Sequence, residues 1–441
     1  MANPSEFPPS SRGLRNLKPT LMFDLQRIVE TFPAYDEGTC PNGLIDIGSS
    51  INVLMQPEAL SYSRRYLLPS AEQCKCLFQH VPSILIKVAL QYGSTAGSPK
   101  LLAGIAQYVN DHFHPSVEIS PSQIMATNGV SALISTLVFN ICDAGEGIMY
   151  PVPEYGMFAH DAKAQNQVEI VEVMMAKVGD RFHADQSELV LEEFRSAHRE
   201  AAENGIKVRA ILLSNPCNPL GRSYSRKTLV AIAKYCAQEG MHFISDEIYA
   251  MSSISRSAAN LDSFTSVLSL EEDEGVSLQN IHCLSGASKD FGMGGLRLGW
   301  LVTRNDALKL TVRKLGAFTW VNAFADNFFG NFLADRVQVS KFLALYQRRL
   351  KAAHVHATTF LSMHVIDYDV SNSGVFIWID LSVWLRFFPE IGRDSPELLL
   401  TYYLMRKGVY VEPGEVSAPK YVEDTLTAIR HSRAPLQADS D

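Results

Sequence analysis

The stretch Ser285-Gly-Ala-Ser-Lys-Asp-Phe-Gly-Met-Gly-Gly-Leu-Arg-Leu-Gly299 joins two short apolar runs, residues 281–285 and 298–303, and overlaps the end of the first and the start of the second. Short apolar runs bounded by turn residues are typical of buried strands, so this stretch is predicted to be a loop at a strand end. Lys289 is flanked by small residues in that loop. If its amine is desolvated, its pKa falls and it becomes able to attack carbonyl groups. Taken alone, the stretch leaves open that Lys289 is an ordinary solvated lysine.

On both sides of this loop, apolar runs alternate with amphipathic stretches along most of the chain. This alternation predicts an α/β fold with a largely parallel sheet, because buried parallel strands are apolar throughout and are linked by helices. A second, smaller unit is expected from both chain ends. The predicted strands lie at 123–126, 147–152, 168–173, 208–214, 241–245, 281–285, 298–303 and 373–382, and the predicted helices at 101–109, 129–139, 226–238 and 325–350.

The composition excludes several classes of protein. The 441 residues are 46% hydrophobic and 20% charged, and 39 Lys and Arg against 47 Asp and Glu give a net charge of −8. This balance offers no basic surface for nucleic acid or for an anionic membrane. Because the chain has neither an apolar leader at its N-terminus nor an 18-residue apolar window, we expect a cytoplasmic protein without a membrane span. The seven cysteines are mostly isolated, which argues against a disulfide framework and against a metal site.

Polar residues follow other predicted strands. Two Asn-Pro dipeptides fix the loop that contains Asn218, and Asp246 with Tyr249 follows strand 241–245. An aspartate at the end of a buried strand is costly unless it meets a cation or several hydrogen-bond donors. A strand-to-helix turn at Gly129, Val130 and Ser131 suits a phosphate group, and Tyr155 offers a ring for stacking.

In this order, the motifs NGVSAL, PEY, NPCNPLG, SDEIY and SGASKDFGMGGLRLG resemble the fold type I pyridoxal 5′-phosphate enzymes of the class I/II aminotransferase group. The resemblance covers roughly residues 40–414. The motif Ser-Lys-Asp-Phe-Gly most resembles the corresponding motif of the 1-aminocyclopropane-1-carboxylate (ACC) synthase-like branch. It implies a large cofactor domain, 66–322, with a mostly parallel mixed sheet between helices. A smaller α+β domain would combine 1–65, which includes an N-terminal arm, with 323–441.

The resemblance also implies residue roles. Lys289 matches the lysine that binds the cofactor and moves the α-proton, and Asp246 the carboxylate beneath the ring nitrogen. Tyr249 and Asn218 match the pair that hydrogen-bonds the ring oxygen, and Tyr155 the stacking aromatic. The phosphate would be held by Gly129, Val130, Ser131, Ser288 and Arg297, and by Tyr92 from the partner subunit of a homodimer with shared active sites.

Three departures from the family pattern concern the phosphate and the substrate. Gly286 occupies a position that is usually serine, for which Ser285 or Ser288 would compensate. In Ser50-Ile51-Asn52, isoleucine replaces the glutamate of ACC synthases, while Ser50 and Asn52 remain predicted substrate contacts. No strand with the usual carboxylate-binding arginine follows residue 414, so Arg430, or else Arg433, is the candidate.

Three functions stay open at this point. The first is an aminotransferase acting on a small-molecule amino acid. The second is an ACC synthase-like lyase that performs γ-elimination or cyclisation, for example on S-adenosylmethionine, although Ile51 weakens that example. The third is a catalytically silent protein that keeps the fold.

Overall fold

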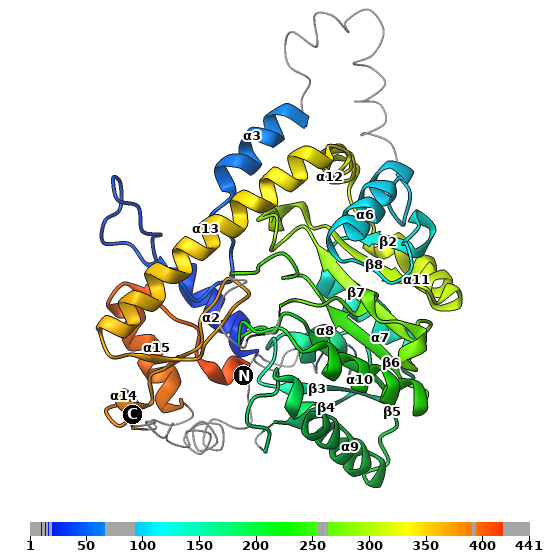
Figure 1. Ribbon diagram of the computed structural model, residues 1–441. Helices are drawn as coiled ribbons and strands as arrows, with labels where there is room; N and C mark the ends of the chain where they lie inside the picture. Colours follow the sequence, from blue (N-terminus) through cyan, green and yellow to red (C-terminus); the bar gives the residue numbers. More distant parts are fainter. Residues whose placement is uncertain are drawn as a thin grey trace, which may run out of the picture.

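The computed structural model describes residues 10, 14, 16, 20–66, 93–175, 177–254, 261, 263–389 and 394–417. Within these residues a seven-stranded sheet forms the centre of the larger part of the molecule (Figure 1). Its strand order is β2-β8-β7-β6-β5-β3-β4, and β8 runs antiparallel to both of its neighbours while the other pairs are parallel. The strands are β2 (Ile124–Thr127), β3 (Gly147–Val152), β4 (Glu169–Met174), β5 (Val208–Ser214), β6 (His242–Asp246), β7 (Ile281–Gly286) and β8 (Gly299–Thr303).

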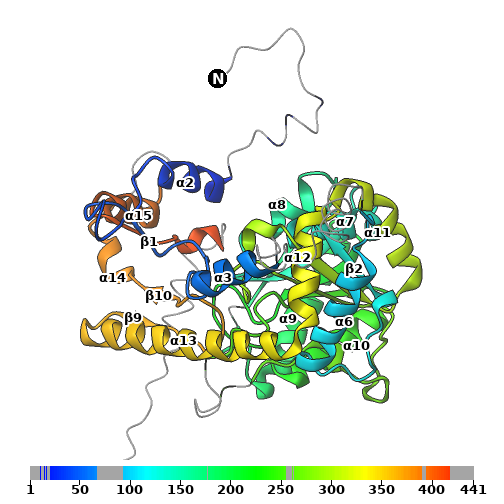
Figure 2. The same ribbon diagram turned by 90° about the horizontal axis from the view of Figure 1, so that it is seen from above.

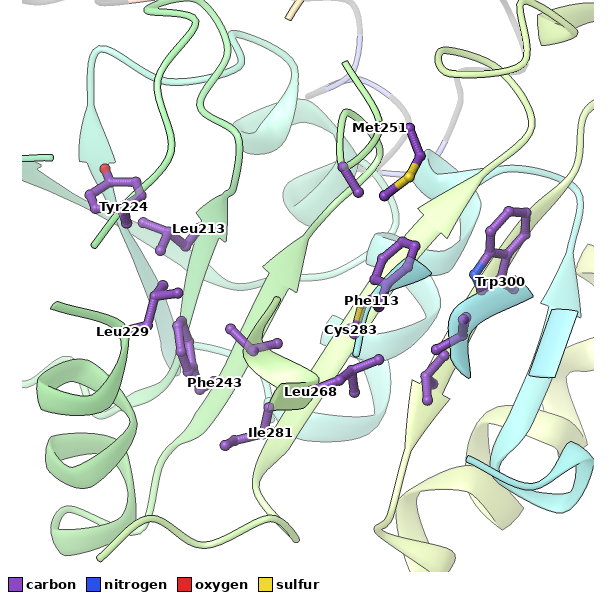
Figure 3. Close-up of a cluster of buried hydrophobic side chains, with 14 of the residues drawn as sticks. Phe113, Leu213, Tyr224, Leu229, Phe243, Met251, Leu268, Ile281, Cys283 and Trp300 are labelled. Carbon is purple, nitrogen blue, oxygen red and sulfur yellow. The ribbon is translucent and has the colours of Figure 1, made fainter. Parts of the chain in front are cut away.

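Helices cover both faces of this sheet because side chains along each strand point alternately to opposite sides. In β5, Ile211 and Leu213 pack into one apolar cluster, and Ala210 and Leu212 into the other. The first cluster, part of which is shown in Figure 3, includes residues of α6 (Pro99–His112), α9 (Ser187–Glu203), α10 (Arg226–Gln238) and α12 (Ala323–Ala334). The second includes residues of α7 (Val130–Ile141), α8 (Phe158–Lys163) and α11 (Asp306–Thr319).

The smaller part is built from both ends of the described chain. The two-residue strands β1 (Ile45–Asp46) and β11 (Val409–Tyr410) pair in parallel and so join segments more than 360 residues apart. The long helix α13 (Arg336–Met363) runs from the sheet-containing part to this smaller part, as Figures 1 and 2 show. The remaining elements here are α2 (Leu21–Val29), α3 (Gln56–Tyr66), β9 (Asp367–Tyr368), β10 (Ile379–Asp380), α14 (Ser382–Leu385) and α15 (Pro396–Arg406).

Short 3-10 helices occupy several turns: η1 (Pro121–Gln123), η2 (Ala184–Gln186), η3 (Val267–Ser269), η4 (Glu272–Glu274), η5 (Gly294–Leu296) and η6 (Gly414–Val416). None of the helices formed by the described residues combines the length and apolar character needed to cross a lipid bilayer. Five cysteines in the described ranges are free thiols, namely Cys40, Cys142, Cys217, Cys236 and Cys283, whereas Cys74 and Cys76 lie outside those ranges.

The predicted α/β fold with a mostly parallel sheet is confirmed, and β3, β5 and α10 have the predicted bounds. The predicted helix 325–350 is in fact two helices, because the chain bends at Asp335, whose side chain caps α13. The predicted strand 373–382 is wrong except for Ile379 and Asp380. Its first residues donate main-chain hydrogen bonds to the loops at Gly221 and Ser252, so they do not form a sheet ladder. The domain boundaries at 65 and 322 stay predictions.

Candidate active site

The carboxyl ends of the parallel strands and the start of β8 meet at one edge of the large sheet. Register pairs place Ser214 beside Asp246 and Asp246 beside Leu284, while Thr127 at the end of β2 lies beside Gly299. The predicted cofactor-binding residues other than Tyr92 follow these strand ends or precede β8, so the topology brings them to the same edge. Ligands of open α/β sheets bind at this edge.

Lys289 lies in the loop after β7, and its side chain is largely buried. Its Nζ donates a hydrogen bond to the main-chain oxygen of Ser50 at 2.9 Å and lies 5.8 Å from the centre of the Tyr249 ring. Burial lowers the pKa of the Lys289 ammonium, while the nearby carboxylates of Asp246 and Glu412 act in the opposite direction. The lysine is therefore not an ordinary solvated side chain, and a larger share of it is the neutral amine than in water.

Asp246 ends β6 and is buried, with 6% of its surface exposed. Burial raises the pKa of its carboxyl to about 7, although the main-chain N–H of Ile248 donates to Oδ1 at 3.2 Å and Lys289 acts to lower the pKa. One donor and a nearby amine do not offset the desolvation. A further cationic partner would therefore stabilise the charged form of this carboxylate.

Tyr249 follows Asp246 by three residues, and its phenol is buried. Within the described residues no group meets its hydroxyl with full hydrogen-bond geometry, although the side chain of Ser50 lies near enough to act on it. Burial outweighs Ser50 and raises the pKa of the phenol well above the ordinary range. Its ring packs edge-on against Phe376, with 5.1 Å between ring centres. A buried hydroxyl without a partner is costly, so this side chain is available to a ligand oxygen.

Asn218 lies in the loop after β5, and that loop is tied to Asp246. The N–H of Asn215 donates to the main-chain oxygen of Asp246 at 2.9 Å, and the N–H of Asn218 donates to Oγ of Ser214 at 3.3 Å. These bonds hold the Asn-Pro-Cys-Asn-Pro loop beside the end of β6. Asn218 is therefore fixed on the same edge as Asp246 and Tyr249.

The start of α7 and Arg297 approach each other closely. Gly129 precedes α7 with φ +123°, and no side chain caps this helix. A Cβ at Gly129 would lie 2.6 Å from Nη2 of Arg297, so only glycine allows the guanidinium to lie against the helix start. Val130 and Ser131 form the first turn. Uncapped N–H groups beside a guanidinium make an anion site.

The structure explains why glycine stands at 286. A Cβ there would come within 2.8 Å of the main-chain oxygen of Leu298, so the position has no room for a serine side chain. The hydroxyl of Ser285 donates to the main-chain oxygen of Glu247 at 3.4 Å. Ser288 is thus the loop serine that remains available to a ligand.

Tyr155 follows β3 and packs edge-on against Phe158, with 5.4 Å between ring centres. Burial raises the pKa of its phenol, and the charges of Asp246 and Arg297 also act on it. Its position near both groups places it at the same edge as the other predicted residues.

Ser50 and Asn52 reach Lys289 from the smaller part of the molecule. The Ser50 contact is made by its main-chain oxygen, and Nδ2 of Asn52 donates to the main-chain oxygen of Lys289 at 2.9 Å. Asn52 is buried, and its Oδ1 has no partner among the described residues. Tyr92, Arg430 and Arg433 lie outside the described residues.

Sequence reasoning missed Glu412 and gave no role to Asp290. Glu412 follows β11 and is near enough to Lys289 that each influences the pKa of the other, and burial raises the pKa of Glu412 to about 7. Its only sequence signal is an acid within the Val-Glu-Pro-Gly segment, which is too common to identify a site. Asp290 stands next to Lys289, but its hydrogen-bond partners, Met251 and Ser252, are distant in the sequence.

Taken together, these groups fit one kind of ligand. The edge offers a buried lysine, a buried carboxylate that lacks a full partner, an unpartnered phenol and an anion site on a helix start. Pyridoxal 5′-phosphate presents an aldehyde, a ring nitrogen, a ring oxygen and a phosphate, one for each of these groups. The described residues contain no group of three or more His, Cys, Asp or Glu suited to a metal ion.

Comparison with known proteins agrees with this fit. The model of the family "Aminotransferase class I and II" matches residues 65–421. The chain is 29% identical over 367 residues to ACC synthase CMW33 of Cucurbita maxima, covering 82% of this chain and 70% of that protein. It is 30% identical over 368 residues to ACC synthase-like protein 1 of Homo sapiens, covering 83% and 68%.

Solved structures show the same fold at low identity. The structure of aspartate aminotransferase from Thermus thermophilus with maleate superposes with a TM-score of 0.70, at 17% identity, covering 93% of each chain. The chain therefore belongs to the aminotransferase class I and II family, it has the fold type I architecture, and its cofactor is pyridoxal 5′-phosphate.

Proposed function

We propose that this protein is an enzyme that removes the α-proton of an amino acid and, in the simplest case, is an aminotransferase. The observation that carries this proposal is the largely buried Lys289 amine, which donates a hydrogen bond at 2.9 Å to a neutral main-chain carbonyl and lies near enough to Asp246 for that carboxylate to act on its pKa. When bound, pyridoxal 5′-phosphate supplies an electron-accepting ring that stabilises negative charge at the α-carbon. The residues of the chain supply binding, orientation and proton transfer.

Lys289 is proposed as the covalent attachment point and the general base. Burial favours its neutral amine, and only the neutral amine attacks a carbonyl or accepts a proton at Nζ. The hydrogen bond to Ser50 is to a neutral carbonyl. Breaking this hydrogen bond, so that the amine can move to the substrate, costs less free energy than breaking an ion pair with a carboxylate.

Asp246, Tyr249 and Asn218 are proposed to orient the cofactor ring. The Asp246 carboxylate would accept a hydrogen bond from the ring nitrogen and hold a proton there, which supplies its missing cationic partner. The Tyr249 hydroxyl and the Asn218 amide would hydrogen-bond the ring oxygen. The unpartnered state of the buried Tyr249 hydroxyl supports this assignment.

Arg297, the α7 start at Gly129, Val130 and Ser131, and Ser288 are proposed to hold the phosphate. Tyr155 is proposed to stack on the ring. By the family resemblance, Tyr92 of a second copy would complete the phosphate site in a homodimer. For the substrate we propose Asn52, Ser50 and Arg430, and we propose the cytoplasm as the location.

A lyase reaction of the ACC synthase type is the second candidate, and it is favoured by the relatives at 29% and 30% identity. Against it stands Ile51, whose side chain is 64% exposed and cannot transfer a proton. We therefore put transamination first. The two reactions are separable, because only transamination requires a keto-acid acceptor.

The first experiment is an absorbance spectrum of the purified protein and of Lys289→Ala, with Lys314→Ala as a matched control at an exposed lysine. Wild type and Lys314→Ala should show the visible band of covalently bound cofactor, and Lys289→Ala should lose it. Turnover of Lys289→Ala should fall about a thousandfold or more. An unchanged spectrum in Lys289→Ala would contradict the proposed role of this lysine.

The reaction class is tested with a panel of amino acids, each with and without pyruvate or 2-oxoglutarate. Keto-acid-dependent turnover supports the aminotransferase. Product formation without an acceptor supports the lyase. Spectral changes with no product from any amino acid would favour a catalytically silent protein.

A further inference from the structure

Asp290, the residue after Lys289, is buried, with 1% of its surface exposed. Its Oδ2 accepts the main-chain N–H of Met251 at 2.8 Å, and its Oδ1 accepts the hydroxyl of Ser252 at 2.6 Å. Both partners follow Tyr249 by two or three residues. The Asp290 carboxylate therefore ties the loop of Lys289 to the loop of Tyr249.

The buried Phe291 ring anchors the turn around Lys289 in the aromatic cluster of the large core, and main-chain hydrogen bonds within the turn set its shape. The N–H of Gly292 donates to the oxygen of Lys289 at 3.0 Å, and the N–H of Met293 donates to the oxygen of Ala287 at 3.0 Å. These bonds fix the shape of the turn but not its position on the sheet edge. Asp290 and Asn52 supply side-chain links from this turn to other segments.

Helix α13 extends the same chain of contacts. The hydroxyl of Tyr346 lies 3.0 Å from Oγ of Ser252, and Nε2 of Gln347 donates to the main-chain oxygen of Met251 at 3.1 Å. One turn along, Arg349 donates to the main-chain oxygen of Leu54 at 2.6 Å and forms a two-bond ion pair with Glu58. α13 thus contacts both segments that hold the lysine turn, the 251–252 stretch and the segment that follows Asn52.

We propose that Asp290 is a positioning residue that, through Ser252 and Tyr346, fixes where the Lys289 amine lies relative to Tyr249 and to helix α13. Proton transfer depends steeply on placement, and a displacement of about 1 Å can cost about a hundredfold in rate. The proposal rests on the proposed function, since it concerns the placement of the proposed base. Asp290 itself would contact neither the cofactor nor the substrate and would act through the residues that it holds in place.

The test uses Ser252→Ala and Asp290→Asn, with Ser225→Ala as the matched control. Ser225 is an equally buried serine that caps α10 and contacts no residue of the proposed site. Tyr346→Phe removes only the hydroxyl that contacts Ser252, at the end of this chain of contacts farthest from Asp290. All variants are measured by the pH midpoint of the visible band, by kcat and KM, and by thermal unfolding.

Ser252→Ala and Asp290→Asn should lower kcat about tenfold to hundredfold with little change in KM. They should also move the pH midpoint by half a unit or more. Tyr346→Phe should act in the same direction with a smaller effect. Ser225→Ala should lower the unfolding temperature and leave kcat and the midpoint at wild-type values.

A second measurement uses the cofactor-free protein. Labelling of Lys289 by an amine-acetylating reagent, followed by peptide mass spectrometry across a pH series, reports the pKa of the amine. In Ser252→Ala and Asp290→Asn this value should rise by half a unit or more towards that of a free lysine, because the amine is less firmly held in its buried place.

Wild-type midpoint, kcat and labelling profile in both variants, with a lowered unfolding temperature alone, would overturn the proposal. That result is distinct from failure of the proposed function. In the latter case the wild-type protein itself would lack the visible band, or Lys289→Ala would keep it.

Discussion

The two parts of the molecule differ in how firmly they hold the proposed site. In the large sheet, β2, β3, β7 and β8 are buried along their whole length, and apolar clusters cover both faces. In the described residues of the smaller part, each strand has two residues and the apolar cluster is small. A cavity of about 1070 Å³ lies there between α13, the 368–382 segment and α15.

The proposed site draws on both parts unequally. The groups assigned to the cofactor follow strands of the sheet, whereas Ser50, Asn52 and Glu412 reach Lys289 from the smaller part. Rigid, well-packed elements position binding and catalytic side chains more accurately than loosely packed elements do. From this difference we expect the sheet to set the geometry of the proposed cofactor site, and the proposed substrate contacts to be easier to change.

The comparison is tested most strongly by one substitution made in each part. Leu213→Ala in β5 removes a fully buried side chain from the large core, and Leu398→Ala removes one from the small cluster in α15. We expect a loss in free energy of unfolding of about 4 kcal/mol for the first and about 2 kcal/mol for the second. Urea unfolding followed by circular dichroism measures both, and equal losses would show that the two parts are packed alike.

A smaller effect is expected at the sheet edge itself. Asp246→Asn keeps the shape of the side chain but removes the charge that would hold a proton on the cofactor ring. We expect turnover to fall about a hundredfold. The matched variant Asp380→Asn, in β10 of the smaller part, should change turnover less than twofold. Comparable losses in the two variants would mean that neither carboxylate has a particular role.

The smallest effect is a pH dependence of stability in the cofactor-free protein. Burial raises the pKa of Asp246 from 3.8 to about 7, so between these values the folded protein binds up to one proton more than the unfolded chain. The stability linked to this proton is present below about pH 4 and is lost as the pH rises through 7.

Asp246→Asn lacks this titration. The free energy of unfolding of the wild type should therefore fall relative to that of Asp246→Asn as the pH rises from about 4 to 7, by up to about 1.4 kcal/mol per pH unit. Above pH 7 the difference between the two proteins should stay constant. Urea unfolding of both proteins at pH 5, 6, 7 and 8 gives the difference. A difference that stays constant across this series would contradict the raised pKa.

Much of the larger part could be predicted from the sequence, because each of its strands is a short apolar run ended by a turn signal. The bounds of β3 and β5 were obtained in this way. The smaller part could not be predicted as well. The run at 373–382 looks like a strand, but Gly374 adopts φ +78°, and Ser373 and Gly374 donate main-chain hydrogen bonds to the loops at Gly221 and Ser252.

The fold class, the family resemblance and the candidate lysine, aspartate, tyrosine and asparagine follow from local motifs at strand ends, so they can be read from the amino-acid sequence alone. Which distant groups meet these residues depends on tertiary packing. Asn52 and Glu412 approach Lys289 from opposite ends of the chain, and Asp290 binds residues 38 and 39 positions away. Such contacts depend on how strands and helices pack, and periodicity along the chain carries no information about them.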